Sequence, residues 1–119
     1  MKRDVMKKWV TALRSNKYKQ GKECLLKDGK HCCLGVLCEI YNKDRTRQGK
    51  NPIKTYINDE KLVRFGRESA VLPETVRRWA GMHSKVGWLP CSNHLAGLND
   101  LGVKFKTLAN KIEKHYDCL

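Results

Sequence analysis

Residues 34–41 read Leu-Gly-Val-Leu-Cys-Glu-Ile-Tyr, a short apolar run in a chain that is otherwise rich in lysine and arginine. Leu34, Leu37, Cys38 and Tyr41 fit one face at helical spacing, which indicates a buried helix. A buried strand stays open as the alternative, because a short apolar run fits both structures. In either form we expect this segment to lie in the core.

Upstream of this run, the sequence predicts one helix and one hairpin. An apolar stripe at helical period runs through residues 5–15, with Asp4 as the expected N-cap. Asn16 is the expected end of that helix, because asparagine tolerates the left-handed conformation. Asp28-Gly29 stands between two short runs and favours a tight hairpin turn.

Downstream of the run, the pattern alternates between strands, loops and helices. We expect a mobile basic loop at 42–52, strands at 53–57 and 62–65, a helix that opens at Leu72-Pro73-Glu74 and ends at Gly81, a short segment N-capped by Ser92 and running through Leu98, and a last helix over 104–116. The last helix has the most regular apolar spacing of the chain.

The length and these elements predict one α+β domain over residues 1–119. We expect three to four helices around a short antiparallel sheet. The chain holds 25 Lys plus Arg against 12 Asp plus Glu, and its net charge of +13 favours an anionic partner. No apolar run approaches the roughly 18 residues of a membrane span. Residues 1–8 are charged with no apolar region behind them, so we expect no secretory signal.

The six cysteines are interpreted as mostly free thiols of a reducing compartment. They are Cys24, Cys32, Cys33, Cys38, Cys91 and Cys118. Cys91 and His94 stand at C-x-x-H spacing, and Cys32, Cys33 and Cys38 could complete a zinc site. Cys32 or Cys33 with His94 could form a thiol–base pair. We favour neither, and expect no metal, no cofactor and no enzymatic activity.

A basic segment from Arg14 to Lys30 surrounds one tyrosine and one glutamine. The candidate ligand-binding residues are Arg14, Lys17, Tyr18, Gln20, Lys22, Asn99 and Asp100. The cations would pair with phosphates, the tyrosine would stack on a base, and the amides and the carboxylate would read base or ribose edges. The alternatives are a solvated basic face for the segment and capping of the last helix for Asn99-Asp100.

Three stretches together resemble a widespread group of small tailed-phage proteins. They are residues 9–21, Cys32-Cys33-Leu34-Gly35-Val36-Leu37-Cys38, and Leu98-Asn99-Asp100-Leu101-Gly102 with the helix that follows. The first motif of the group reads W-x-x-A-L-R-S-G-x-Y-x-Q, and this chain has Asn16 where the glycine stands. The resemblance implies a phage-encoded binding protein that acts in the cytoplasm of the infected bacterial host. By analogy, it is compatible with anti-CBASS sponges, which trap cyclic dinucleotides inside an oligomer.

We therefore expect a non-enzymatic homo-oligomer that sequesters an anionic phosphate ligand, a cyclic nucleotide immune signal, to block host anti-phage defence. One alternative is a basic nucleic-acid-binding protein. Residues 105–112 are similar to a helix of a helix-turn-helix unit, but the second helix is missing. Another alternative is a protein inhibitor of an acidic host enzyme, for which positive charge would speed encounter. No membrane partner is expected.

Overall fold

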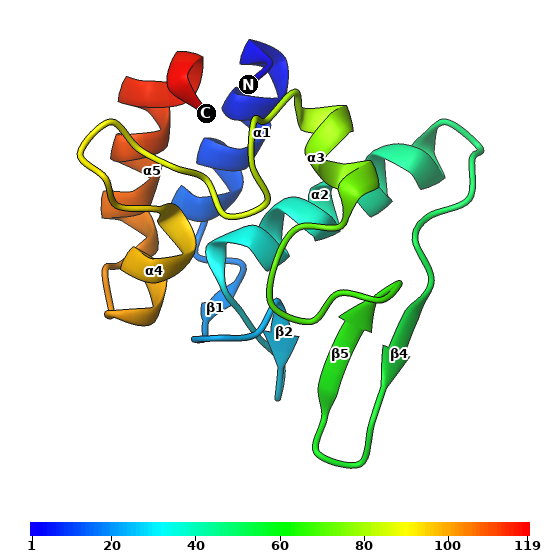
Figure 1. Cartoon of the computed structure of the whole chain (residues 1–119). Helices are drawn as coiled ribbons and strands as arrows, with labels where there is room; N and C mark the ends of the chain where they lie inside the picture. The colour runs from blue at the N-terminus through cyan, green and yellow to red at the C-terminus, as the bar shows by residue number, and fades with distance from the viewer.

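The apolar run lies inside a helix, α2 (Cys33–Arg47), which crosses the middle of the molecule (Figure 1). The structure is a computed structural model that describes residues 1–119. From Cys33 to Cys38 every residue of α2 is buried, so this part of the helix faces protein on all sides. The helical interpretation of the run is thus confirmed, and the strand alternative is wrong.

Four more α-helices and a final 3₁₀ turn surround α2. They are α1 (Arg3–Arg14), α3 (Glu74–Ala80), α4 (Leu95–Asp100), α5 (Phe105–His115) and η1 (Tyr116–Cys118). The apolar faces of α1 and α5 pack against each other, as the stripes in the sequence predict (Figure 1). Trp9 of α1 is fully buried, and its indole N–H donates to the Cys33 carbonyl at 2.9 Å. This bond ties α1 to the start of α2.

Five short strands form one sheet in the order β1-β3-β2-β5-β4. They are β1 (Lys19–Gln20), β2 (Leu26–Lys27), β3 (Lys30–His31), β4 (Thr55–Ile57) and β5 (Leu62–Phe65). All neighbours are antiparallel except β1 and β3, which are parallel. The sheet is therefore mixed, and it differs from the expected short antiparallel sheet only in the pairing of β1 with β3. The loop between β1 and β2 reverses the direction of the chain, and the hairpin between β2 and β3 reverses it again. For this reason β3 runs in the same direction as β1.

The α+β class is confirmed, with five α-helices in place of the expected three to four. The fifth is α4, a six-residue helix. The Asp28-Gly29 hairpin is also confirmed, because both residues have positive φ angles of 53° and 74°, as a type I′ turn requires. None of the helices combines the length and the apolar character that a membrane-spanning segment requires.

The basic loop expected at 42–52 is helical over its first half, because α2 continues to Arg47. Asp44 accepts hydrogen bonds from Lys8, Arg47 and Gln48, and so offsets the positive charge that made the segment resemble a loop. The Asn42 side chain of α2 accepts from the Ile53 N–H at 2.9 Å and donates to the Ile53 carbonyl at 3.3 Å. These two bonds attach the segment that follows α2 to the helix.

Two expected helix caps are also wrong. Asp4 lies in the first turn of α1, whose N-cap is Lys2. The N-cap of α4 is His94, whose Nδ1 accepts from the Gly97 N–H at 2.8 Å, and Ser92 lies outside the helix. The end of α3 agrees with the sequence, since Gly81 adopts the left-handed conformation there.

Candidate functional site

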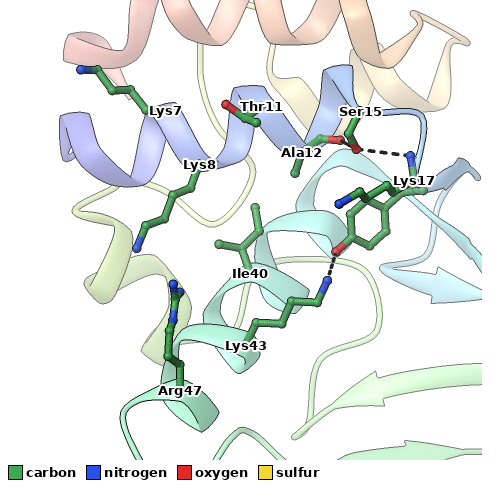
Figure 2. Close-up of a pocket in the computed structure, with 10 residues that line it drawn as sticks. Lys7, Lys8, Thr11, Ala12, Ser15, Lys17, Ile40, Lys43 and Arg47 are labelled. Carbon is green, nitrogen blue, oxygen red and sulfur yellow. Dashed lines mark hydrogen bonds between the residues drawn. The ribbon is translucent and has the colours of Figure 1, made fainter.

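A groove between α1 and α2 gathers cationic side chains from both helices (Figure 2). Its volume of about 440 Å³ lies within the range of small-molecule sites, roughly 300–1,000 Å³. It is lined by Lys7, Lys8, Thr11, Ala12, Ser15, Lys17, Tyr18, Ile40, Lys43 and Arg47. We call this surface the basic groove.

The basic groove has five cations and no carboxylate among its lining residues. Asp44, which is mostly buried beside it, pairs with Lys8 at 3.4 Å and with Arg47 at 3.1 Å. Lys7 and Lys17 form no ion pair. The surplus of positive charge makes the potential in the basic groove positive, because a concave wall focuses the field of its charges.

Tyr18 and Lys43 meet at one end of the basic groove. The Lys43 ammonium donates a hydrogen bond to the Tyr18 hydroxyl at 2.9 Å. This bond is the main reason that the pKa of Lys43 is raised above its ordinary value. Lys43 is therefore held in its charged form beside a half-buried aromatic ring.

The local sequence explains how Lys17 and Tyr18 reach the groove. Asn16 has a φ of 62°, so it ends α1 in the left-handed conformation and turns the chain. The Ser15 hydroxyl donates to the Ala12 carbonyl at 2.6 Å and accepts from the Lys17 N–H at 3.2 Å. The turn therefore folds back beside the last turn of the helix.

A second hollow adjoins the basic groove along α2. Its volume is about 550 Å³, and it shares Lys43 and Arg47 with the basic groove. Glu39 is the one acidic side chain that lines it. Lys43 and Arg47 therefore line both hollows. Together the two hollows have room for a larger ligand than the basic groove has by itself.

Of the residues predicted from the sequence, only Lys17 and Tyr18 line the basic groove. Arg14 lies on another side of α1, where its guanidinium contacts Glu113 at 3.3 Å and Asn110 at 2.6 Å of α5. Asp100 accepts from the Glu23 N–H at 2.7 Å. Lys22 carries its ammonium beside Gly102 at the end of α4.

Gln20 and Asn99 are brought together, but as structural groups. The Gln20 Oε1 accepts from the Phe105 N–H at 3.0 Å and so caps α5, and its amide donates to the Asn99 Oδ1 at 3.0 Å. The same Asn99 oxygen accepts from the Cys33 N–H at 3.2 Å, at the first residue of α2. Asn99 thus caps α2 from a distant part of the chain, and the expectation that Asn99-Asp100 caps the last helix is wrong.

Sequence reasoning missed Lys7, Lys8, Lys43 and Arg47 in the basic groove. Lys43 and Arg47 are four residues apart, which places them on one face of a helix. The four-residue spacing was visible in the sequence, but it indicates a shared face only if residues 42–47 form a helix, and a loop was expected there. No sequence pattern marked Lys7 and Lys8, because the opposite wall of the basic groove belongs to α2.

Cys32, which precedes α2, and the two cysteines of α2 are buried, and all three are unsuited to nucleophilic chemistry. Burial raises the pKa of the Cys32 thiol to about 11, and it raises the pKa of Cys33 and of Cys38 as well. A thiol held in its protonated form is a poor nucleophile and a poor metal ligand. His94 uses its Nδ1 as a helix cap. No group of three or more His, Cys, Asp or Glu side chains is placed to hold a metal ion.

The raised thiol pKa predicts that stability falls in alkaline solution. Above about pH 8.5 an unfolded thiol loses its proton while native Cys32 keeps it up to about pH 11, so the unfolded state is favoured as pH rises. Below this window the contribution is fully present. We expect the free energy of unfolding to fall by up to about 1.4 kcal/mol per pH unit for this thiol. Urea unfolding of the wild type and of Cys32→Ala at a series of pH values measures this effect. Equal slopes of the free energy of unfolding against pH in the two proteins would contradict it.

The chain belongs to a family described as a domain of unknown function, DUF8296, which matches residues 1–116. Comparison with curated proteins and with solved structures finds no match.

Proposed function

We propose that this protein is a non-enzymatic binding protein that sequesters a phosphate-bearing small molecule, a cyclic nucleotide, in the basic groove. The observation that carries this proposal is a hollow lined by five cations and by no carboxylate. Three of them, Lys7, Lys17 and Lys43, form no ion pair within the chain. A phosphate would supply the missing counter-charge.

The other lining groups suit the rest of a nucleotide. Tyr18 offers an aromatic ring on which a base can stack. Thr11 and Ser15 offer hydroxyls, and Ala12 and Ile40 offer apolar surface. Capture needs only affinity, and micromolar binding corresponds to about −8 kcal/mol. With the resemblance to small tailed-phage proteins, these features support a role in which the protein withdraws a host nucleotide signal and so blocks anti-phage defence.

A thermal-shift screen against linear and cyclic nucleotides at near-physiological salt tests the proposal. A ligand at 100 times its Kd is expected to stabilise the native state by about 2.7 kcal/mol. Selective stabilisation by one nucleotide supports the proposal. No shift with any member of the panel would overturn it for those ligands.

Lys17→Ala and Arg14→Ala form a matched pair, because each removes one positive charge near the end of α1. Lys17→Ala is expected to weaken binding about tenfold or more, as the loss of a hydrogen bond to a charged group does. Arg14→Ala should leave the affinity unchanged, because its guanidinium faces α5. Equal weakening by both variants, with a steep loss of binding as salt rises, would instead indicate general attraction of polyanions such as DNA.

A further inference from the structure

The strand β4 forms an open edge of the sheet. It pairs with β5 on one side and is last in the strand order. All three of its residues are exposed, and Ile57 is 69% exposed. The β4–β5 hairpin extends away from the helices in Figure 1, so no other element covers this edge. An uncovered edge presents unpaired N–H and C=O groups to any further strand.

The register of the hairpin determines which backbone groups point outward. The Lys54 carbonyl accepts from Gly66, and the Asn58 N–H donates to Leu62. Because bonded and non-bonded positions alternate in an antiparallel pair, Thr55 and Ile57 turn their N–H and C=O groups away from β5. The free edge therefore offers two donors and two acceptors, spaced for one more strand.

The outward backbone groups of β4 are complementary to the same groups of β4 in a second copy of the chain. If two β4 strands run antiparallel about a two-fold axis at Tyr56, each Thr55 faces Ile57 of the other copy. Four backbone hydrogen bonds then form, and the two Tyr56 side chains become a non-bonded cross-strand pair. The Ile57 side chain covers Thr55 of the second copy, which removes exposed apolar surface from water.

The charges along this edge match in the same arrangement. Lys54 stands before the strand, and Asp59 and Glu60 follow it in the turn. Antiparallel apposition places Lys54 opposite Asn58 of the second copy, beside the turn that holds Asp59 and Glu60. The chain carries a net charge of +13, whereas residues 54–61 hold two basic and two acidic side chains. This stretch is therefore close to neutral, unlike the chain as a whole.

We propose that two copies of this chain associate through β4, edge to edge, and join their sheets into one continuous ten-stranded sheet. The basic groove of each copy stays within its own chain. The ligand-binding function does not depend on this association, and the association does not depend on the ligand.

A cysteine placed at the two-fold axis tests the register. Tyr56→Cys is made in a Cys91→Ser, Cys118→Ser background, which removes the two exposed native thiols. Cα atoms of a non-bonded antiparallel pair lie about 4.5 Å apart, within disulfide reach, so mild oxidation should give a covalent dimer. Lys54→Cys in the same background is the matched control. Its two copies would lie about 13 Å apart, too far for a disulfide.

Light scattering of the protein in solution tests the association itself. The wild type is expected to be a dimer. Thr55→Pro is expected to be a monomer with an unchanged circular dichroism spectrum, because proline removes an outward N–H and leaves the bonds between β4 and β5 in place. A monomeric wild type, a dimeric Thr55→Pro variant, or equal cross-linking of the Tyr56→Cys and Lys54→Cys variants would overturn the proposal.

Discussion

Replacement of Gly35 by alanine is expected to lower the free energy of unfolding by about 3–5 kcal/mol, although alanine is the better helix former. A Cβ atom at position 35 would lie 1.8 Å from the carbonyl oxygen of Leu25 and 2.7 Å from its carbonyl carbon. Both are backbone atoms, so no side-chain rotation relieves the overlap. The start of α2 would have to move away from the segment before β2, within a fully buried region.

Chemical denaturation of Gly35→Ala beside Gly49→Ala measures this effect. At Gly49 a Cβ meets nothing within 4 Å, and the only cost is its φ of 72°, about 1 kcal/mol. Gly35→Ala should therefore lose much more stability than Gly49→Ala. Similar losses in the two variants would show that α2 and the Leu25 backbone do not pack as closely as the structure has them.

Asn99→Ala is expected to cost about 3 kcal/mol or more, because a fully buried side chain satisfies three other groups. Its Oδ1 accepts from the Cys33 N–H and from Gln20, and its Nδ2 donates to the Gly21 carbonyl at 2.8 Å. The Cys33 N–H belongs to the first turn of α2 and has no partner within that helix. Alanine would leave the Cys33 N–H without a partner in a fully buried region, and it would also remove the partner of the half-buried Gly21 carbonyl, whereas Gln20 keeps its bond to the Val103 carbonyl.

Asp100→Ala is the neighbouring control for this prediction. Asp100 is exposed and accepts one hydrogen bond, from the Glu23 N–H. Its removal should cost about 1 kcal/mol, since water can replace the bond. The midpoint of thermal unfolding should fall by roughly 10 °C or more for Asn99→Ala, and by only a few degrees for Asp100→Ala. Equal shifts would contradict the role of Asn99 as the cap of α2.

Part of the candidate site could be predicted from the sequence. Lys17 and Tyr18 were recognisable as a cation next to an aromatic ring, directly after a residue that can end a helix. The other cations of the basic groove come from the middle of α1 and the end of α2, and only packing of the two helices brings them together. Gln20 and Asn99 look like ligand-reading amides in the sequence. In the structure, Gln20 accepts a hydrogen bond from the first residue of α5, and Asn99 accepts one from the first residue of α2.

The sequence by itself determined the α+β class, the positions of α1 and α5, the burial of the apolar run that begins α2, the Asp28-Gly29 turn and the positive charge. These features depend on neighbours within a few residues, where apolar period, turn geometry and composition act directly. Tertiary structure alone decided the parallel pairing of β1 with β3, the close approach of Gly35 to Leu25 and the capping of α2 by Asn99. Each of these joins parts of the chain whose contact is set by how the elements pack, and no local pattern records it. The basic groove is of the same kind, because its two walls are separate helices.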